Sequence, residues 1–351
     1  MAKKPTLRDV SHAAGVSVYT VSQALNDGPG VATSTRAHVL ETAQRLGYVA
    51  NRSAQELRKK SHSSIAVVTA SVSNYYYLDM MRGIQRVLRA KDRAAVVADI
   101  AIEGRYSRAL EDASVRQLIQ ARAAGVVATL TLRPENVELL NRWEIPIVFV
   151  DSAPPPTHAE VPRVSTDNIK ASATLGEHLQ GHGYRRWLFV AYPSRWSSRA
   201  DRERGLRLAA DRAGATLEVL ESDNDPGSSF DSFGAWLDSA GSSLPDVLIA
   251  GNNPLLDGML RALDLRGIHI PQDTALVAFD EFPWAPYLNP PLTVLNEDSE
   301  SIGACAATIL NRILDEKTAA EKAGQGSVPI DSPTDRVEVD AHLIVRRSCG
   351  C

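Results

Sequence analysis

Beyond residue 64 the chain repeats one pattern, in which a short apolar run precedes a longer amphipathic stretch. Eight apolar runs of six or seven residues recur, and they cover 65–70, 94–100, 125–130, 145–151, 187–192, 217–222, 246–251 and 275–280. Helical periodicity marks stretches between them, such as 77–90, 107–123 and 168–181. Strands that are apolar on both faces are typical of parallel sheets covered by helices on each side. We therefore predict an α/β core with two doubly wound parallel sheets, one beginning near residue 63 and the other near residue 163.

The first 26 residues show helical periodicity instead. Thr6 and Asp9 have the spacing of an N-cap and its acidic partner, and Gly15 supplies a tight turn. The first helix has an apolar face, which we assign to Leu7, Val10, Ala13 and Ala14. Ser17 caps a second helix, whose inward residues we expect to be Val18, Val21, Ala24 and Leu25.

The outward face of this second helix carries uncharged side chains that form hydrogen bonds. They are Tyr19, Thr20, Ser22, Gln23 and Asn26. Such a helix, after a short turn that contains glycine, can place side chains against base edges in the major groove of DNA. The alternative is a helical hairpin that packs into a larger core, and we favour the groove-reading interpretation.

A third helix is predicted over residues 33–48, after a loop rich in Gly and Pro. We expect its buried stripe and its end to be formed by Val39, Leu40, Ala43, Leu46 and Gly47. Three short helices bury little surface, so residues 1–50 form a small all-α head of low stability. Residues 51–62 follow as a hinge segment and basic linker. The first lobe of the core is then 63–162 with about 293–327, and the second is 163–292 with about 328–351.

Charge is unevenly divided along the chain. The net charge is −4, yet residues 1–62 carry nine Lys and Arg against four Asp and Glu, a net charge of +5. The remaining 289 residues therefore carry −9. A small basic head on an acidic body suggests that only the head meets phosphate groups.

Polar residues follow several of the predicted strands. They are Ser71, Asp151, Asn252, Asn253, Asp280 and Glu281. Ligands bind at the carboxyl ends of parallel strands, so these positions predict a cleft there.

The cysteines and histidines do not predict a metal centre. Cys305, Cys349 and Cys351 are odd in number and form no CxxC motif, so neither a disulfide framework nor a zinc site is indicated. His178 and His182 have an i, i+4 spacing that suits a metal, but no third ligand is evident. We interpret this pair as helix-end packing and capping, and we expect no cofactor.

Motifs of common enzymes and of exported proteins are absent from the sequence. No GxSxG, Walker A, HExxH or GxGxxG motif occurs. No apolar run follows the lysines near the N-terminus, and no window approaches 18 apolar residues. We expect a cytoplasmic protein that is not an enzyme and does not contact a membrane.

These motifs together resemble the LacI/GalR family of bacterial transcription regulators over nearly the whole chain. Residues 6–26 resemble the family's helix-turn-helix, and residues 35–57 resemble its third helix and hinge helix. Motifs similar to its two-lobed, periplasmic-binding-protein-like core occur in the expected order at 167–186, 197–209, 249–281, 290–295 and 337–348. The resemblance implies a homodimer that binds a near-palindromic operator, with an affinity switched by a small ligand between the lobes.

The resemblance also implies which residues contact DNA. The main base-reading positions are those of Val18, Tyr19 and Gln23. The other implied DNA contacts in the head are Thr6, Thr20, Ser22 and Asn26. Gln23 departs from a common Arg, and Gln favours adenine where Arg favours guanine. In the hinge the implied contacts are Asn51, Ala54 and Leu57, and Leu57 would wedge between base pairs in the minor groove.

Three further departures from the family pattern occur in the hinge and at the start of the third helix. Ala50 replaces the Pro that usually precedes the hinge, and Gln55 replaces an Arg, so bending of DNA is not assumed. Ala32 stands where a Ser commonly caps the third helix, and Thr33 is the expected substitute.

For the effector, the resemblance implies that Arg202 grips the ligand and that Asp280 binds its hydroxyl groups. The other implied lining residues are Ser71, Asp151 and Asn252, with Trp196 and Trp284 as candidates for an aromatic face. An Arg fork with carboxylate and amide acceptors suits a polyhydroxylated ligand such as a sugar. A solute-binding protein of the same two-lobed fold, without DNA-linked regulation, is the alternative. Induction and corepression both stay open, and a dimer is favoured because no heptad-bearing helix follows the last strand.

Overall fold

The computed structural model describes residues 5–25, 28–48, 64–69, 74–102, 105–194, 196–241, 243–324 and 335–351. It divides into two compact units, residues 1–62 and residues 63–351. We call them the head and the core unit and describe each by itself.

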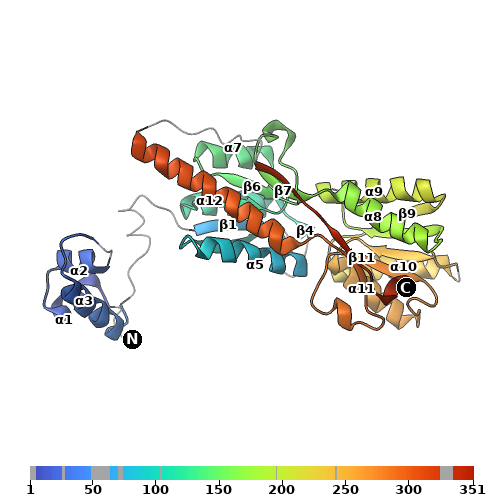
Figure 1. Ribbon diagram of the computed structural model, residues 1–351, viewed down its shortest axis with the longest axis horizontal. Helices are drawn as coiled ribbons and strands as arrows, with labels where there is room; N and C mark the ends of the chain where they lie inside the picture. The colour runs from blue at the N-terminus through green and yellow to red at the C-terminus, as the bar shows by residue number, and fades with distance from the viewer. Residues whose placement is uncertain are drawn as a thin grey trace. The chain divides into compact units, whose positions relative to one another are not determined.

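The described part of the head contains three helices, α1 (Leu7–Ala14), α2 (Val18–Leu25) and α3 (Thr33–Arg45) (Figure 1). The predicted cap of α1 is confirmed, because Thr6 Oγ1 accepts a hydrogen bond from Asp9 N while the Asp9 carboxylate accepts one from Thr6 N at 2.7 Å. Gly15 ends α1 with a φ of 66°, a left-handed conformation that favours glycine. The turn between α1 and α2 therefore follows directly from the sequence.

The apolar core of the head contains fewer residues than the sequence predicted. It consists of Val10, Ala14, Val21, Ala24, Val39 and Ala43. The inward assignment of Val18 and Ala13 was wrong, as was that of Leu40 and Leu46, since all four are exposed. Three short helices can cover only one narrow strip of each other, so the flanking apolar residues remain on the surface.

The start of α3 lacks a side-chain cap. Ala32 occupies the N-cap position without a side-chain hydrogen bond, so Thr33 does not substitute for the expected Ser. Arg36, in the first turn of α3, instead ties the helix to its neighbour. Its guanidinium donates to the carbonyl of Ala24 at 3.0 Å and to that of Gly28 at 2.8 Å. This cation thus satisfies one carbonyl group at the end of α2 and one in the loop that follows it.

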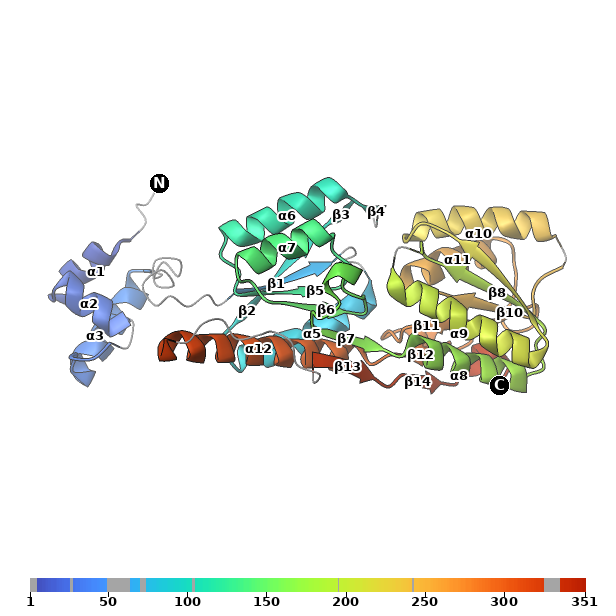
Figure 2. The same cartoon turned by 90° about the horizontal axis from the view of Figure 1, so that it is seen from above.

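The described residues of the core unit form two six-stranded sheets. The first has the order β13-β7-β6-β5-β1-β2, and its strand pairs are all parallel. Its strands are β1 (Ser64–Thr69), β2 (Ala94–Asp99), β5 (Gly125–Ala128), β6 (Ile147–Val150), β7 (Arg163–Thr166) and β13 (Arg336–Val339). One face is covered by α5 (Tyr75–Arg89) and α12 (Ser299–Ala323), and the other by α6 (Arg108–Gln120) and α7 (Pro134–Arg142) (Figure 2). A small hairpin joins β3 (Ala101–Ile102) to β4 (Arg105–Tyr106).

The second sheet has the order β14-β12-β11-β10-β8-β9 and is parallel except for β14. Its strands are β8 (Arg186–Ala191), β9 (Thr216–Glu221), β10 (Val247–Ala250), β11 (Ala275–Phe279), β12 (Thr293–Asn296) and β14 (His342–Ile344). Helices α8 (Asn168–Gly181) and α9 (Ser197–Ala213) cover one face, and α10 (Pro226–Ala240) and α11 (Asn253–Leu265) the other (Figure 2). The fold class is confirmed, and each of the eight predicted apolar runs overlaps a strand.

The chain passes between the two sheets three times, and this changes the expected lobe boundaries. It crosses between β7 and α8, between β12 and α12, and between β13 and β14. Residues 163–166 and 336–339 therefore belong to the first sheet rather than the second, and 293–296 belong to the second sheet rather than the first. These strands have only four residues each, and their residue types do not reveal which sheet they join.

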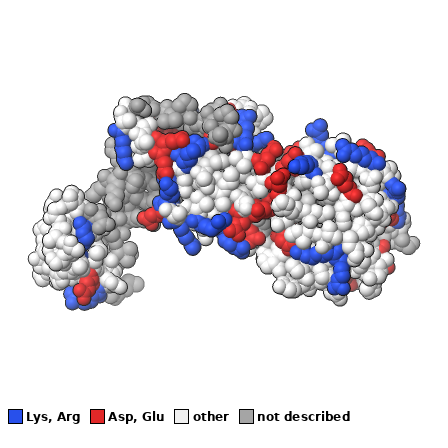
Figure 3. All heavy atoms as spheres, in the orientation of Figure 1, with Lys and Arg blue, Asp and Glu red and all other residues white. Residues whose placement is uncertain are grey.

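None of the helices in the described part of the chain has the length and apolar character needed to span a membrane. On the face seen in Figure 3, basic and acidic side chains are interspersed over the core unit.

Candidate functional site

Helix α2 presents an uncharged, capped surface at its N-terminal end. Ser17 Oγ accepts a hydrogen bond from Thr20 N at 3.0 Å, as the sequence predicted. Tyr19 is 72% exposed and Val18 is 41% exposed, so both predicted base-reading side chains are accessible. Thr20 and Ser22 are half-buried on the same helix. This surface has the chemistry of a groove reader, with one aromatic, one apolar and two hydroxyl side chains.

Gln23 lies against the loop that follows α2. A Cβ atom built on Gly28 would fall 1.6 Å from Gln23 Oε1, so the amide is seated directly over this glycine. The backbone reinforces the arrangement, since Gly28 N donates to Gln23 O at 2.9 Å. Only glycine at position 28 leaves room for the Gln23 amide in this position.

Several predicted contacts lie outside the described residues. They are Asn26 in the head, Asn51, Ala54 and Leu57 in the hinge, and Ser71 after β1. Six of the nine basic residues in the head also lie outside them, within 1–4 and 49–63. Thr6 is described, and its side chain serves as the cap of α1.

In the core unit, a cleft between the two lobes centres on Arg202 of α9. Arg202 is 4% exposed, and its guanidinium lies over the Phe279 ring, 4.4 Å from the ring centroid. Its Nη1 donates to the Gly251 carbonyl at 2.6 Å, and its Nε donates to Asn168 Oδ1 at 2.9 Å. Its Nη2 lies 2.8 Å from Glu297 Oε2 and 3.5 Å from Asp280 Oδ1.

Arg202 therefore joins three parts of the core unit. Asn168 opens α8 just after the first chain crossing, and Glu297 lies in the second crossing. Both are buried, as is Asp280 after β11. Most of the guanidinium's donors are engaged by the protein itself, and the 3.5 Å contact with Asp280 is the longest of them. Burial disfavours the charged form, but Glu297 and Asp280 raise the pKa of Arg202 and keep it protonated.

Two carboxyl groups of the cleft hold their protons unusually well. Burial raises the pKa of Asp280 to about 7, with Arg202 opposing the shift and Glu297 reinforcing it. Burial, with Glu297 acting in the same direction, also raises the pKa of Asp151 well above its ordinary value. Asp151 is partly exposed, but its Oδ1 is buried and has no hydrogen-bond partner among the described residues. Such groups are suited to exchange hydrogen bonds with an incoming hydroxyl group.

Amide and aromatic side chains complete the cleft, which opens to solvent and has a cavity volume of about 40 Å³. Asn252 caps α11 and donates to Asn224 Oδ1 at 2.7 Å. Tyr76 Oη is buried and finds no hydrogen-bond partner within the described parts of the chain. Tyr192 packs edge-on against Trp196, with ring centroids 6.2 Å apart. The mixture of groups suits a small polar ligand.

Direct contacts link the two lobes at the cleft. Asn253 Nδ2 lies 3.4 Å from Asn74 Oδ1, and Ala153 N donates to Ser197 Oγ at 3.0 Å. Trp284 packs edge-on against Tyr75 with centroids 6.1 Å apart. A ligand that binds between the lobes therefore competes with, or adds to, a small set of existing contacts.

The described residues predicted for the effector do come together. Asp151, Trp196, Arg202, Asn252 and Asp280 all line this cleft. Trp284 is not among its lining residues and packs between the lobes instead. The sequence did not indicate four further residues at or beside the cleft, Glu297, Tyr76, Tyr192 and Asn224. The strand-end rule, applied to 293–296, would have indicated Glu297, whereas no local signal marks the others.

The chain is similar to known proteins over nearly its whole length. Residues 6–51 match the pattern of bacterial regulatory proteins of the lacI family, and residues 177–349 match a periplasmic binding protein-like domain. The HTH-type transcriptional regulator PtxS of Pseudomonas plecoglossicida is 32% identical, over 98% of this chain and 95% of that relative.

Two solved structures have a similar fold. The lac repressor dimer bound to operator and the anti-inducer ONPF has a TM-score of 0.78 at 22% identity, over 99% of both chains. A complex of the transcriptional regulator CelR with cellobiose has a TM-score of 0.67 at 25% identity, over 98% of this chain and all of that one.

Proposed function

The chain belongs to the lacI family of bacterial regulatory proteins, and we propose that it binds a polyhydroxylated effector in the cleft around Arg202. The chain is a DNA-binding transcriptional regulator. The simplest effector of the proposed class is a sugar or a sugar derivative. We infer that it represses transcription as a cytoplasmic homodimer on a near-palindromic operator. It binds its ligand without chemical conversion. The observation that supports this proposal most directly is the set of buried polar groups that surround Arg202 between the two lobes.

The cleft supports a sugar by its hydrogen-bonding chemistry. Vicinal hydroxyl groups require paired donors and acceptors, which Arg202, Asp280 and Asn252 can supply. Tyr76 Oη and Asp151 Oδ1 are buried atoms that have no partner among the described residues, and a ligand hydroxyl group would satisfy them. The aromatic pair Tyr192 and Trp196 offers an apolar surface for a ring. The CelR structure contains cellobiose, which is consistent with this class of ligand on this fold.

Helix α5 provides a physical route from the cleft to the outer surface of the first lobe. Its N-cap Asn74 and its first-turn residues Tyr76 and Tyr77 line the cleft. Its other face carries Leu78, which is 50% exposed. A ligand that binds one arrangement of the lobes more tightly shifts the population toward it, and α5 then moves as a rigid element.

The edge of the first sheet supports self-association. Strand β2 is an edge strand, and its Val96 and Val97 are 49% and 45% exposed. Leu78 of α5 and Val97 border the same apolar hollow. An apolar edge strand next to an apolar helix face is costly to leave in water, so we propose that a second copy of the chain covers it.

The proposal is tested by measuring DNA affinity with and without candidate ligands. Operator sequences are first selected from random DNA with the full chain. We expect log affinity to fall linearly and steeply with log salt, because phosphate contacts release counterions. A thermal-shift screen of sugars and sugar phosphates then identifies the effector, since a ligand that binds the folded state raises the melting temperature. Ligand binding without any DNA binding would instead support the solute-binding alternative.

A further inference from the structure

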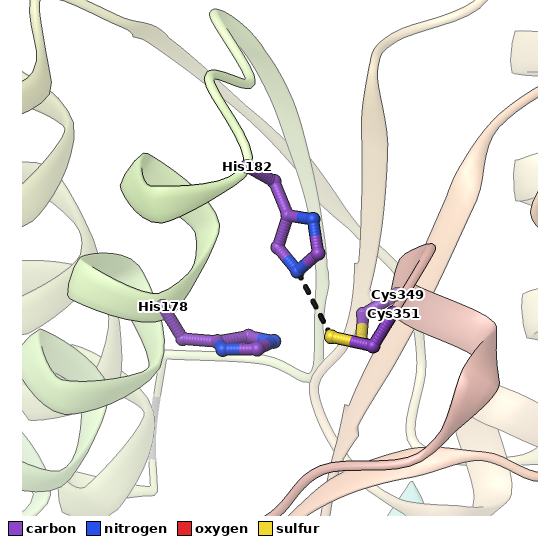
Figure 4. Close-up of side chains that lie close together, drawn as sticks. All are labelled: His178, His182, Cys349 and Cys351. Atoms are coloured by element: carbon purple, nitrogen blue, oxygen red, sulfur yellow. Dashed lines mark hydrogen bonds between the residues drawn. The ribbon is translucent and has the colours of Figure 1, made fainter.

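Four potential metal ligands meet at the end of α8 in the second lobe. They are His178, His182, Cys349 and Cys351, and their nearest ligand atoms all lie within 4.8 Å of one another. Figure 4 shows both imidazole rings pointing from the end of α8 toward the two sulfur atoms. Cys351 Sγ lies 3.2 Å from His182 Nε2 and 3.2 Å from Cys349 Sγ. The four side chains therefore surround one point.

We propose that these residues form a structural zinc site of the Cys2His2 type. Zn–N and Zn–S bonds of about 2.0–2.3 Å place tetrahedral ligand atoms about 3.3–3.8 Å apart. The observed spacing is within a small side-chain adjustment of that geometry. Four protein ligands leave no open position, which is typical of a structural zinc ion rather than a catalytic one. Two thiols and two imidazoles suit zinc better than calcium or magnesium, which prefer oxygen ligands.

Local structure accounts for the convergence of the four side chains. His178 lies in the last turn of α8 and His182 is its C-cap, so both point to the same side of the helix. Cys349 ends a short 3-10 helix, Arg347–Cys349, and Gly350 follows it with a φ of 90°. A Cβ atom at position 350 would lie 2.8 Å from Tyr184 Oη. Gly350 is therefore required for the turn that sets Cys351 beside Cys349.

The surroundings of the cluster favour bound metal. His178 Nε2 is buried and has no hydrogen-bond partner among the described residues, so a metal ion would satisfy it. Tyr184 stacks on the His182 ring, with centroids 5.2 Å apart, and donates to the Cys349 carbonyl at 2.7 Å. Thr293 Oγ1 lies 3.1 Å from Cys349 Sγ and can donate to a thiolate there. Partners of this kind orient metal ligands and tune their affinity.

The sequence alone did not predict this site, because His178 and His182 had no third ligand nearby in the chain. The fold supplies two, from a segment about 170 residues away. A disulfide is the other possible fate of the two thiols, but it requires the sulfur atoms to close from 3.2 Å to about 2.05 Å. Metal binding needs no oxidant, and the two thiols release their protons to solvent as the thiolates bind zinc.

The test uses the full chain without a histidine tag, purified with a phosphine reductant. We expect about one zinc ion per chain to survive dialysis. Cobalt(II) added to the metal-free protein should give the visible bands of a tetrahedral ion and the thiolate charge-transfer band. Zinc should also protect Cys351, which is exposed, from alkylation.

Two conservative variants separate metal binding from folding. Cys351→Ser and His182→Gln should each weaken zinc binding at least tenfold while tryptophan fluorescence shows a folded core unit. Cys305→Ser is the matched control, because Cys305 lies on α12 and faces no histidine of the cluster. Zinc content that is unchanged in Cys351→Ser would overturn the proposal. An octahedral cobalt spectrum, or a metal-free protein with a Cys349–Cys351 disulfide, would do the same.

Discussion

Arg202 and Glu297 form a buried ion pair in which Nη2 and Oε2 are 2.8 Å apart. Arg202 comes from α9 in the second lobe, and Glu297 lies where the chain returns from β12 toward α12 and the first lobe. Their side chains are 5% and 0% exposed. The ion pair therefore connects the base of the cleft to one of the segments where the chain crosses between the lobes.

Replacing Glu297 by Ala should destabilise the core unit by about 3–5 kcal/mol, because the Arg202 charge would stay buried with one partner fewer. All five tryptophans lie between residues 143 and 284, so the intrinsic fluorescence during urea unfolding reports on the core unit alone. Glu221→Ala is the control. It removes an exposed partner of Arg199 at 3.4 Å and should cost less than about 1 kcal/mol. Equal losses in the two variants would show that the buried pair has no special role.

Asp280 should make the stability of the core unit depend on pH. Its pKa is raised by burial from the ordinary value of 3.8 to about 7, so the folded state holds the proton more tightly than the unfolded state. The contribution of this group is therefore full below about pH 3.8 and is lost as the pH rises to about 7. Asp280→Asn, which cannot ionise, should flatten the fall of the unfolding free energy across this window. A variant with the slope of the natural protein would assign the dependence to other groups, such as Asp151.

Tyr76 should contribute to ligand binding through its hydroxyl group alone. Tyr76→Phe keeps the packed ring and removes a buried Oη that has no partner among the described residues. Effector affinity should fall about 3- to 10-fold, as expected for one lost hydrogen bond. The ligand-free melting temperature should not fall. Tyr75→Phe, one position earlier and outside the cleft lining, should leave both quantities unchanged. Calorimetry with the effector found in the screen measures the effector affinity of each of the two variants.

The layers of the core unit could be predicted from the sequence alone, and the reason is physical. Strands such as β10 and β11 are buried on both faces, so their apolar residues are continuous and easy to find. Strands β7 and β13 lie at one side of their sheet and mix polar with apolar residues. Their assignment to a sheet depends on the three chain crossings, which have no local signature.

The same distinction applies to the sites. Asp280 and Asn252 follow apolar strands, so their positions could be predicted from the chain alone. Glu297 contacts Arg202 across 95 residues of sequence, and the cysteine pair meets His178 only in the folded lobe. Val18 was assigned to two roles at once, in the centre of the head and at the DNA surface. The structure exposes it, which leaves only the second role open.

The missing cap of α3 can be restored. Ala32 already has the extended conformation of an N-cap, with φ −61° and ψ 146°, but it has no side-chain acceptor. Ala32→Ser should therefore stabilise the head by about 1 kcal/mol, and Thr6→Ala should destabilise it by a similar amount through loss of the α1 cap. Hydrogen exchange of the backbone amides in α1 and α3 measures both changes. Slower exchange in both variants, or in neither, would contradict the capping argument.

Gln23 should determine one base of the operator. Its amide can bond bidentately to adenine, whereas an Arg at this position would prefer guanine. Selection from random DNA with Gln23→Arg should therefore change one symmetry-related pair of operator positions from adenine toward guanine, with a discrimination of about 1–3 kcal/mol. Gly28→Ala provides an independent check, because the new Cβ would occupy the seat of the Gln23 amide and displace it. The Gly28→Ala protein should lose its base preference at the same operator positions without gaining a preference for guanine. An operator consensus that is identical for all three proteins would remove Gln23 from the reading surface and leave Val18 and Tyr19 to specify the site.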